Sequence, residues 1–384
     1  MFLTVLGFLL LALAIVAGVT VAMGNREVRA LPEVAVDEGA SWPKLSVVIA
    51  ARNEARDVEA AVRSMLAIDY PNLEIVAVDD RSEDATGTIL DGLARENPIL
   101  KTLRIRELPD GWLGKNHALH QGAMASKGEW ILFTDADVHF HAGAVKKAVA
   151  YALSESKDHL AVIPDVVVSG QILPMMISYF TLCFALNFQP WKVRDPKSAK
   201  FVGIGAFNLV RRSAYQNVGG HTRIALRPDD DLRLGQLLKR AGARSDLLLS
   251  QGWVRVEWYR SFPEMFRGLE KNVFAGADYS VAKMAAMTVV TLLIHVFPFV
   301  FLLVCKSMFL WALYAGVATA WFLAALDNNR FHRMPSWTAF VLPFSALLML
   351  ATMLHSAGKT LWLGGIRWRG TFYPLRALRS NPIS

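Results

Sequence analysis

Cysteine is nearly absent from this sequence, which has two cysteines among 384 residues. Cys183 and Cys305 both lie in apolar stretches, so neither a disulfide framework nor a thiolate metal site is expected. Charged residues are also few, at 19% against 53% hydrophobic residues. No soluble stretch interleaves basic with aromatic residues, which excludes a nucleic-acid partner despite the net charge of +8. The excess of apolar residues indicates membrane segments instead.

Long hydrophobic runs account for this excess. Residues 2–23 contain no charge and are long enough to cross a bilayer. A signal peptide would require a basic residue before the apolar run, and none is present. Arg26 and Arg29 instead follow the run. The positive-inside rule therefore predicts an uncleaved anchor and a catalytic region in the cytoplasm, in a multi-pass protein of the cell (inner) membrane. The predicted domains are the anchor at 1–24, the catalytic domain at 43–275, transmembrane segments within 281–357 (apolar runs at 284–305, 308–326 and 336–357) and a basic tail at 358–384.

Between the anchor and the distal runs, strand and helix patterns alternate. Residues 45–51, 73–78 and 130–134 are continuous apolar runs of strand length. Helical periodicity follows each of the first two, and Ser82 has the character of an N-cap for the second helix. Continuous apolar strands separated by helices predict an α/β fold with a mostly parallel sheet that is covered on both faces.

Acidic residues follow two of these strands directly. Asp79 and Asp80 end the second strand, and Asp135 and Asp137 end the third. Because ligands bind beyond the carboxyl ends of parallel strands, we expect both pairs to face one site. Two carboxylates in an Asp-x-Asp pattern suit a hard divalent cation, Mg²⁺ or Mn²⁺, that holds a diphosphate. Lys115 could add a positive charge for the phosphates, and an ordinary solvated lysine is the alternative.

A third acidic cluster contains three consecutive carboxylates, Asp229, Asp230 and Asp231. Adjacent like charges raise one another's pKa, and the flanking Arg227 and Arg233 could offset that effect if they point inward. Such a cluster could supply a general base, bind a cation or simply begin a helix. The residues alone leave these three readings open.

Four segments resemble the family 2 glycosyltransferases in their order and approximate spacing. They read VVIAARNEARDVEAAVRSM, IVAVDDRSEDATG, GWLGKNHALHQGAMASKGEWILFTDADV and RPDDDLRLG, and the match covers roughly residues 44–275. With its membrane segments, the chain resembles the branch that includes ceramide glucosyltransferases and the hopanoid- and carotenoid-associated bacterial enzymes. The resemblance implies a GT-A fold, an inverting reaction, a nucleotide-diphosphate sugar (a UDP-sugar) as donor and a membrane lipid as acceptor.

The resemblance also assigns roles at the matching positions. Asp231 would be the catalytic base, with Asp230 beside it. Asp135 and Asp137 would handle the divalent metal and the diphosphate, with Asp137 favoured as the direct ligand. The donor-binding residues would be Ala51, Arg52, Asn53, Glu54, Asp79, Asp80, Lys115 and Asp135.

The chain departs from the polymer-forming members of that family. Those carry a Gln/Arg-x-x-Arg-Trp motif after the base, whereas residues 269–276 read LEKNVFAG, with Asn272 where the arginine would fall. We therefore expect transfer of a single sugar. A processive polysaccharide synthase and a non-catalytic membrane protein that binds nucleotide sugars are the alternatives.

Three further segments bear on how the chain meets the membrane. Residues 171–191 and 261–274 are predicted to be helices in the membrane interface, with buried core helices as the alternative. The tail is basic and has no acidic residue, which favours the cytoplasmic side, although three full crossings would leave it outside. We therefore expect at least one distal segment not to cross, and residues 367–369 to lie on the membrane surface near the lipid entrance.

Overall fold

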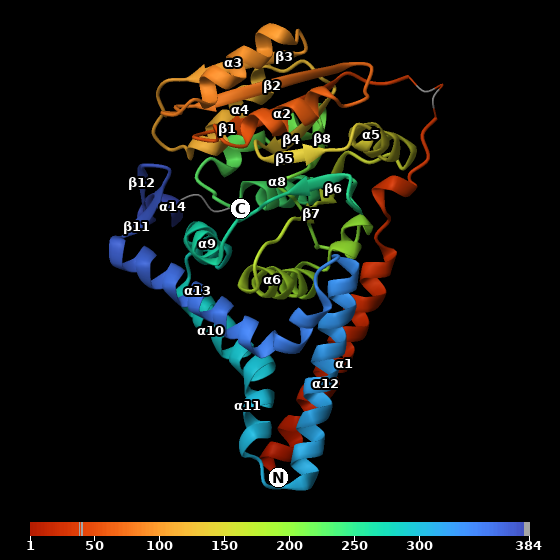
Figure 1. The fold of residues 1–384 in the computed structure, drawn as a ribbon, viewed down its shortest axis with the longest axis vertical. Helices are drawn as coiled ribbons and strands as arrows, with labels where there is room; N and C mark the ends of the chain where they lie inside the picture. The colour runs from red at the N-terminus through yellow and green to blue at the C-terminus, as the bar shows by residue number, and fades with distance from the viewer. Residues whose placement is uncertain (38, 40, 380–384) are drawn as a thin grey trace.

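The computed structural model describes residues 1–37, 39 and 41–379. Figure 1 shows an α/β domain at one end of the molecule and a stalk of apolar helices at the other. Further helices lie across the molecule between these two parts. Residues 380–384 of the predicted basic tail lie outside the described residues.

A seven-stranded sheet forms the centre of the domain, in the order β3-β2-β1-β4-β8-β6-β9. β8 runs antiparallel to β4 and β6, and the other neighbouring strands are parallel. The predicted α/β fold with a mostly parallel sheet is confirmed. The strands are β1 (Leu45–Ala51), β2 (Leu73–Asp80), β3 (Leu100–Ile105), β4 (Trp130–Asp135), β6 (His159–Ile163), β8 (Asn208–Arg211) and β9 (Ser245–Leu249).

Helices cover both faces of this sheet because its central strands are apolar on both sides. Successive side chains of a strand point to opposite faces. In β1, Val47 and Ile49 join a core formed with α2, α3 and α5, whereas Val48 joins a second core formed with α4 and α8. The helices of the domain are α2 (Val58–Leu66), α3 (Thr86–Glu96), α4 (Gly114–Ala125), α5 (Ala144–Ser154), α7 (Arg212–Asn217) and α8 (Asp230–Arg240).

The predicted helix start at Ser82 is wrong. α3 begins at Thr86, and the hydroxyl of Ser82 accepts a hydrogen bond from the backbone N–H of Asn53 instead. Asp84 accepts from the N–H of Thr86 at 2.9 Å. The segment between β2 and α3 is therefore a turn that supports the end of the neighbouring strand β1.

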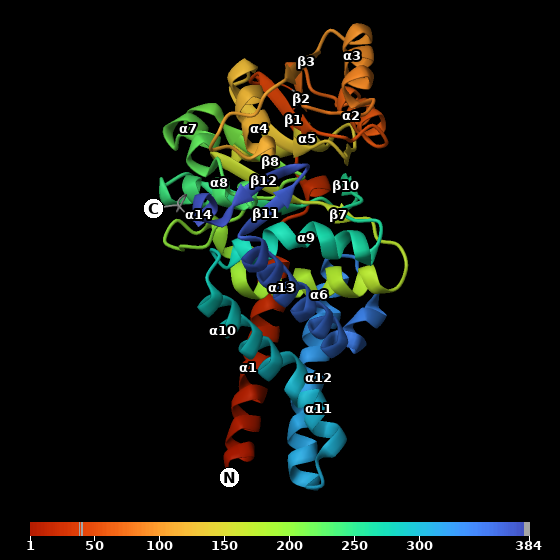
Figure 2. The same cartoon turned by 90° about the vertical axis from the view of Figure 1, so that its left-hand side faces the viewer.

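Among the described residues, five helical segments are long and apolar enough to cross a membrane. Figures 1 and 2 show three of these segments running away from the domain: α1, α12, and the succession of α10 and α11. α1 packs along α12, so the N-terminal anchor and a distal segment form one stalk. The five segments are Phe2–Glu27 (α1), Ile172–Arg194 (containing α6, Ile172–Phe188), Val281–Val304 (α10, Val281–Thr291; the π-helix Leu292–Val296; α11, Phe297–Val304), Met308–Phe331 (α12) and Ser336–Leu363 (containing α13, Leu342–Leu363).

The other two apolar segments, which contain α6 and α13, lie across the domain-facing end of the stalk, together with the amphipathic helix α9. α6 and α9 (Phe262–Gly276) run across the direction of α1 (Figure 2), and α13 packs against both. α13 starts near the domain end of α12 and leads back to the domain, so this distal segment does not run the length of the stalk. The predicted interfacial stretches 171–191 and 261–274 correspond to α6 and α9.

Small strands and short helices complete the fold. A three-stranded sheet in the order β5-β10-β7 lies beside the main sheet, and a hairpin of β11 and β12 follows α13. These elements are β5 (Val138–Phe140), β7 (Asp165–Val166), β10 (Val254–Val256), β11 (Gly365–Trp368), β12 (Thr371–Pro374) and α14 (Leu375–Arg379), with 3-10 helices at Leu31–Glu33, Pro190–Arg194, Gly220–Ile224 and Ser336–Val341.

Candidate active site

The turns that follow β1 and β2 are joined by hydrogen bonds. Asn53 has a positive φ of 54°, and its side-chain oxygen accepts from the N–H of Glu83 at 2.8 Å. The N–H of Glu54 donates to the hydroxyl of Thr86 at 2.8 Å. The predicted donor-binding turn 51–54 therefore lies next to the end of β2, which carries Asp79 and Asp80, as the parallel sheet requires.

Asp79 and Asp80 are both buried at this edge. Asp79 accepts a hydrogen bond from the N–H of Ser82 at 3.1 Å. Asp80 is held by Arg81, whose Nε lies 2.8 Å from its Oδ1, and a Cβ built on Gly114 would lie 2.2 Å from its Oδ2. Glycine at the first position of α4 thus allows this helix to approach the carboxylate closely.

Lys115 connects two of the acidic clusters. Its Nζ lies 2.7 Å from Asp135 Oδ1 and 3.6 Å from Asp230 Oδ1. Burial acts to lower the pKa of Lys115, but Asp135, Asp230 and Asp231 together raise it above the ordinary value, so the side chain stays charged. Burial acts to raise the pKa of Asp135, but Lys115 holds it below its usual range. Lys115 is therefore a partner of the carboxylates and not a solvated surface lysine.

For Asp137, the effects that raise the pKa outweigh the effect of Lys115. Burial, together with Asp135 and Glu54, raises its pKa to about 7. Carboxylates crowded in this way favour a bound cation. Among the described residues there is no group of three or more side chains of metal-ligand type, so a metal here would take its other ligands from the donor and from water. Asp135 and Asp137 fit a divalent cation that is bound together with a diphosphate.

Asp230 and Asp231 begin α8, opposite the β4 end. Burial and the neighbouring Asp230 raise the pKa of Asp231 to about 7, while its Oδ1 accepts from the N–H of Leu232 at 2.8 Å. A Cβ built on Gly205 would lie 2.8 Å from Asp135 Oδ2 and 3.4 Å from Asp231 Oδ2. The two carboxylates therefore flank the same point, and the acidic cluster is both a helix start and a part of the site.

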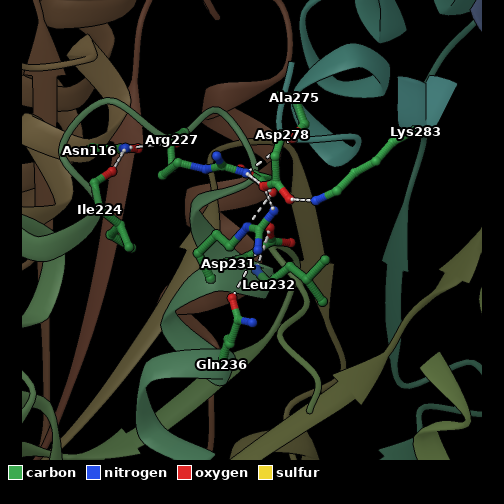
Figure 3. A network of polar contacts seen from close by, with 11 residues as sticks. Asn116, Ile224, Arg227, Asp231, Leu232, Gln236, Ala275, Asp278 and Lys283 are labelled. Atoms are coloured by element: carbon green, nitrogen blue, oxygen red, sulfur yellow. Dashed lines mark hydrogen bonds and ion pairs between the residues drawn. The ribbon is translucent and has the colours of Figure 1, made fainter. Parts of the chain in front are cut away.

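The third carboxylate, Asp229, belongs to an ionic network whose members Arg227, Asp278 and Lys283 are labelled in Figure 3. Arg227 and Arg233 both donate to it, with their Nε atoms 2.9 and 2.7 Å from its oxygens. Both arginines also reach Asp278, which pairs with Lys283 at 2.7 Å. The flanking arginines thus point to Asp229 and Asp278, so they do not counteract the raised pKa of Asp231.

Two cations that the sequence did not reveal also belong to this region. Lys271 of α9 places its Nζ 3.8 Å from the ring centre of Trp368. Arg369, at the tip of the β11–β12 hairpin, donates to the carbonyl of Arg52 and to the carboxylate of Glu54. Residues 367–369 were expected on the membrane surface; in the structure Arg369 contacts the turn after β1 and Trp368 contacts Lys271 of α9. These contacts join residues far apart in the chain, 315 residues for Arg369 and Glu54, so no local sequence pattern could predict them.

Comparison with known proteins agrees with this geometry. Residues 46–219 match the family described as glycosyl transferase family 2. The chain carries a family 2 glycosyltransferase domain. The matched residues include the Asp79–Asp80 pair, Lys115, Asp135 and Asp137, whereas Asp229 and the two carboxylates that begin α8 lie beyond them.

Curated relatives of this glycosyltransferase domain include enzymes whose names specify lipid-like acceptors. The chain is 25% identical over 246 residues to 4,4'-diaponeurosporenoate glycosyltransferase from Staphylococcus haemolyticus, with 63% of this chain and 64% of the relative covered. It is 28% identical over 201 residues to beta-monoglucosyldiacylglycerol synthase from Synechocystis sp., with 50% and 40% covered. The chain thus spans less than two thirds of the length of these relatives.

Among solved structures, the chain is similar to a mannosyltransferase from Pyrobaculum calidifontis in complex with GDP-Man and Mn²⁺. The TM-score is 0.56 at 18% identity, with 94% of this chain and 99% of that chain covered. A similarity at this identity shows a shared fold. The predicted GT-A fold of the glycosyltransferase domain is therefore confirmed.

Proposed function

We propose that the protein transfers a single sugar from a nucleotide-diphosphate sugar, a UDP-sugar, to a hydroxyl group of a membrane lipid, with inversion and with a divalent metal. The observation that carries this proposal is the meeting of the β4 and α8 carboxylates around Lys115, next to helices that lie across the apolar stalk. The relatives named for a carotenoid acid and for a glucosyldiacylglycerol support a lipid acceptor. The GDP-Man and Mn²⁺ of the similar structure support a nucleotide-sugar donor and a metal.

Asp231 is the base of the proposed reaction. Its carboxylate takes the proton of the acceptor hydroxyl, and the acceptor oxygen attacks the anomeric carbon as the bond from that carbon to the diphosphate oxygen breaks. One displacement inverts the anomeric configuration. The raised pKa of Asp231 makes it a stronger base than an ordinary aspartate.

Lys115 positions the two sets of carboxylates on either side of the reacting atoms. By pairing with Asp135 and Asp230 at once, it fixes the β4 end relative to the start of α8. Asp135 and Asp137 would hold the divalent cation, which supplies charge neutralisation for the departing diphosphate. Residues 51–54, Asp79 and Asp80 would hold the nucleotide.

The arrangement of the apolar helices supports a lipid acceptor and a cytoplasmic domain. α6, α9 and α13 lie between the domain and the stalk, where a lipid headgroup would meet the site from the membrane interface. Arg26 and Arg29 lie at the domain end of α1, the side that the positive-inside rule assigns to the cytoplasm. This topology gives the domain access to cytoplasmic nucleotide sugars.

The test is a transfer assay with isolated membranes that contain the protein. Membranes are incubated with radiolabelled UDP- and GDP-sugars and Mn²⁺, and the lipids are extracted and separated. We expect one labelled lipid that carries a single sugar, and no label from the Asp231→Asn variant. A labelled polymer would support the processive alternative. Nucleotide-sugar binding without any labelled product would support the non-catalytic alternative.

A further inference from the structure

The C-terminal hairpin has a tight and well-defined tip. Trp368 pairs with Thr371, which leaves Arg369 and Gly370 as a two-residue turn with φ values of 47° and 83°. Positive φ at both central residues is the geometry of hairpin turns that match the twist of their strands. The base of the hairpin is anchored by α14, whose Leu378 is buried and whose Arg379 donates to the carbonyl of Tyr279 at 2.8 Å. The hairpin therefore presents Arg369 in a fixed place.

The tip of the hairpin touches the side of the site that is proposed to hold the nucleotide. Arg369 donates to the carbonyl of Arg52 and to Glu54, both in the turn after β1. Tyr373 of β12 is buried beside Arg81 and Asp80, at the end of β2, and accepts from the N–H of Gly114. The hairpin thus closes over the strand ends, 315 residues along the chain from the turn that it contacts.

Lys271 brings a second cation to the same place from α9. No carboxylate of the described residues lies within salt-bridge distance of its ammonium, which instead lies 3.8 Å from the ring centre of Trp368. Asp135 is influenced electrostatically by both Lys271 and Arg369 as well as by Lys115. Burial, with repulsion from Lys115 and Arg369, lowers the pKa of Lys271 to about 7. Lys115 of α4, Lys271 of α9 and Arg369 of the hairpin therefore all act on Asp135, and an anion bound between these cations would relieve the repulsion that Lys271 feels from the other two.

We propose that Lys271 and Arg369 bind the diphosphate of the donor, so that the C-terminal hairpin completes the donor site. This inference rests on the proposed function, whose donor is a nucleotide-diphosphate sugar. A diphosphate offers several charged oxygens, and a guanidinium can bind two of them at once. In the structure Arg369 pairs with Glu54, and the diphosphate takes over that guanidinium when the donor binds. Lys271, which has no carboxylate of the described residues within salt-bridge distance, supplies a second positive charge to the bound diphosphate.

Nucleotide affinities of the full-length protein in lipid nanodiscs with Mn²⁺ test this proposal. UDP and UMP are compared, and GDP and GMP likewise, by calorimetry. Arg369→Gln and Lys271→Gln are each expected to weaken the diphosphate by about tenfold or more and the monophosphate by about twofold or less. Arg369→Lys is expected to recover part of the loss. Arg367→Gln is the matched control, because Arg367 is exposed on the same hairpin and is expected to leave every affinity unchanged.

The outcomes separate this inference from the proposed function. Equal weakening of diphosphate and monophosphate would show that the two cations only maintain the fold, and would overturn the proposal. Unchanged diphosphate affinity in both variants, with the wild type binding normally, would overturn it while leaving the proposed function intact. A folded wild-type protein that binds none of the four nucleotides would overturn the proposed function and this inference together.

Discussion

Asp231 illustrates how neighbouring side chains can set the chemistry of a single carboxylate. Its flanking arginines are drawn away by Asp229 and Asp278, while Asp230 lies beside it in the buried start of α8. The same feature of the sequence, three consecutive acids, thus separates into one residue of an ionic network and two residues of the proposed site. The separation follows from which face of the first helical turn each side chain occupies.

The role of Asp231 as base predicts a selective loss of turnover. Asp231→Asn should lower kcat by about 10²–10⁴-fold, the usual contribution of a general base, while donor affinity stays within about twofold. The measurement is steady-state transfer together with UDP binding. If Asp230→Asn abolishes turnover while Asp231→Asn retains most of it, the base has been assigned to the wrong carboxylate.

The pH dependence of transfer should report the same group. A base works only when it is ionised, so kcat at saturating Mn²⁺ and saturating donor should rise about tenfold per pH unit below about 7 and level off above it. The pKa of Asp137 is also raised to about 7, so protons compete with the metal there, and saturating metal removes that effect. A rate that is constant from pH 5.5 to 8 would show that Asp231 titrates like an ordinary aspartate.

At the scale of elements, the turn between β4 and β5 and the start of α8 form two halves of one site. Chelation of divalent metal should abolish transfer, added Mn²⁺ or Mg²⁺ should restore it, and Asp137→Ala should respond to neither. The measurement is transfer in membranes washed with chelator. Full activity in excess chelator would exclude the metal.

The position of α8 depends on close contact with the segment before β8. A Cβ built on Gly235 would lie 1.6 Å from the carbonyl oxygen of Val202, so no side chain fits there without displacing backbone. Gly235→Ala should therefore destabilise the domain by about 1–3 kcal/mol, or more, as overpacking does. Gly276→Ala in α9 is the control, because nothing lies within 4 Å of a Cβ at that position. Thermal unfolding of the two purified variants compares them, and equal midpoints would contradict the contact.

At the scale of the whole molecule, the positions of the stalk and the hairpin lead to a prediction of how the chain crosses the membrane. The turn between α11 and α12 lies at the end of the stalk away from the domain, whereas the hairpin lies on the domain (Figure 1). The described part of the tail, up to Arg379, lies on the domain because α13 begins and ends near it, and we predict that the two share one side of the membrane.

Single cysteines should show this arrangement in a variant without Cys183 and Cys305. An impermeant maleimide applied to intact cells should label Lys306→Cys, which is exposed in the α11–α12 turn. The same reagent should label Arg367→Cys only after the cells are permeabilised, because Arg367 is exposed on the side of the domain. Labelling of Arg367→Cys in intact cells would place the hairpin, and the domain that it contacts, outside.

The sequence alone predicted the parts of this protein that depend on neighbouring residues. Apolar runs specify β1, β2 and β4, and a parallel sheet necessarily brings the carboxylates at their ends to one edge. Charge-free runs of sufficient length specify the apolar helices in the same way. That Asp231 belongs to the same site as Asp135 was predicted only from the family resemblance, since the residues alone did not decide the role of the acidic cluster.

Only the tertiary structure decided which distant residues join the site. Arg369 meets Glu54 because α13 lies across the stalk and returns the chain to the domain, and this depends on its packing against α6 and α9 rather than on its composition. By composition, α13 matches a helix that crosses a membrane. By its sequence, Lys271 resembles any lysine of an amphipathic helix, and only the fold brings it to Trp368 and under the electrostatic influence of Lys115. Local patterns record what a segment buries, whereas a contact between segments far apart in the chain depends on how the whole molecule packs.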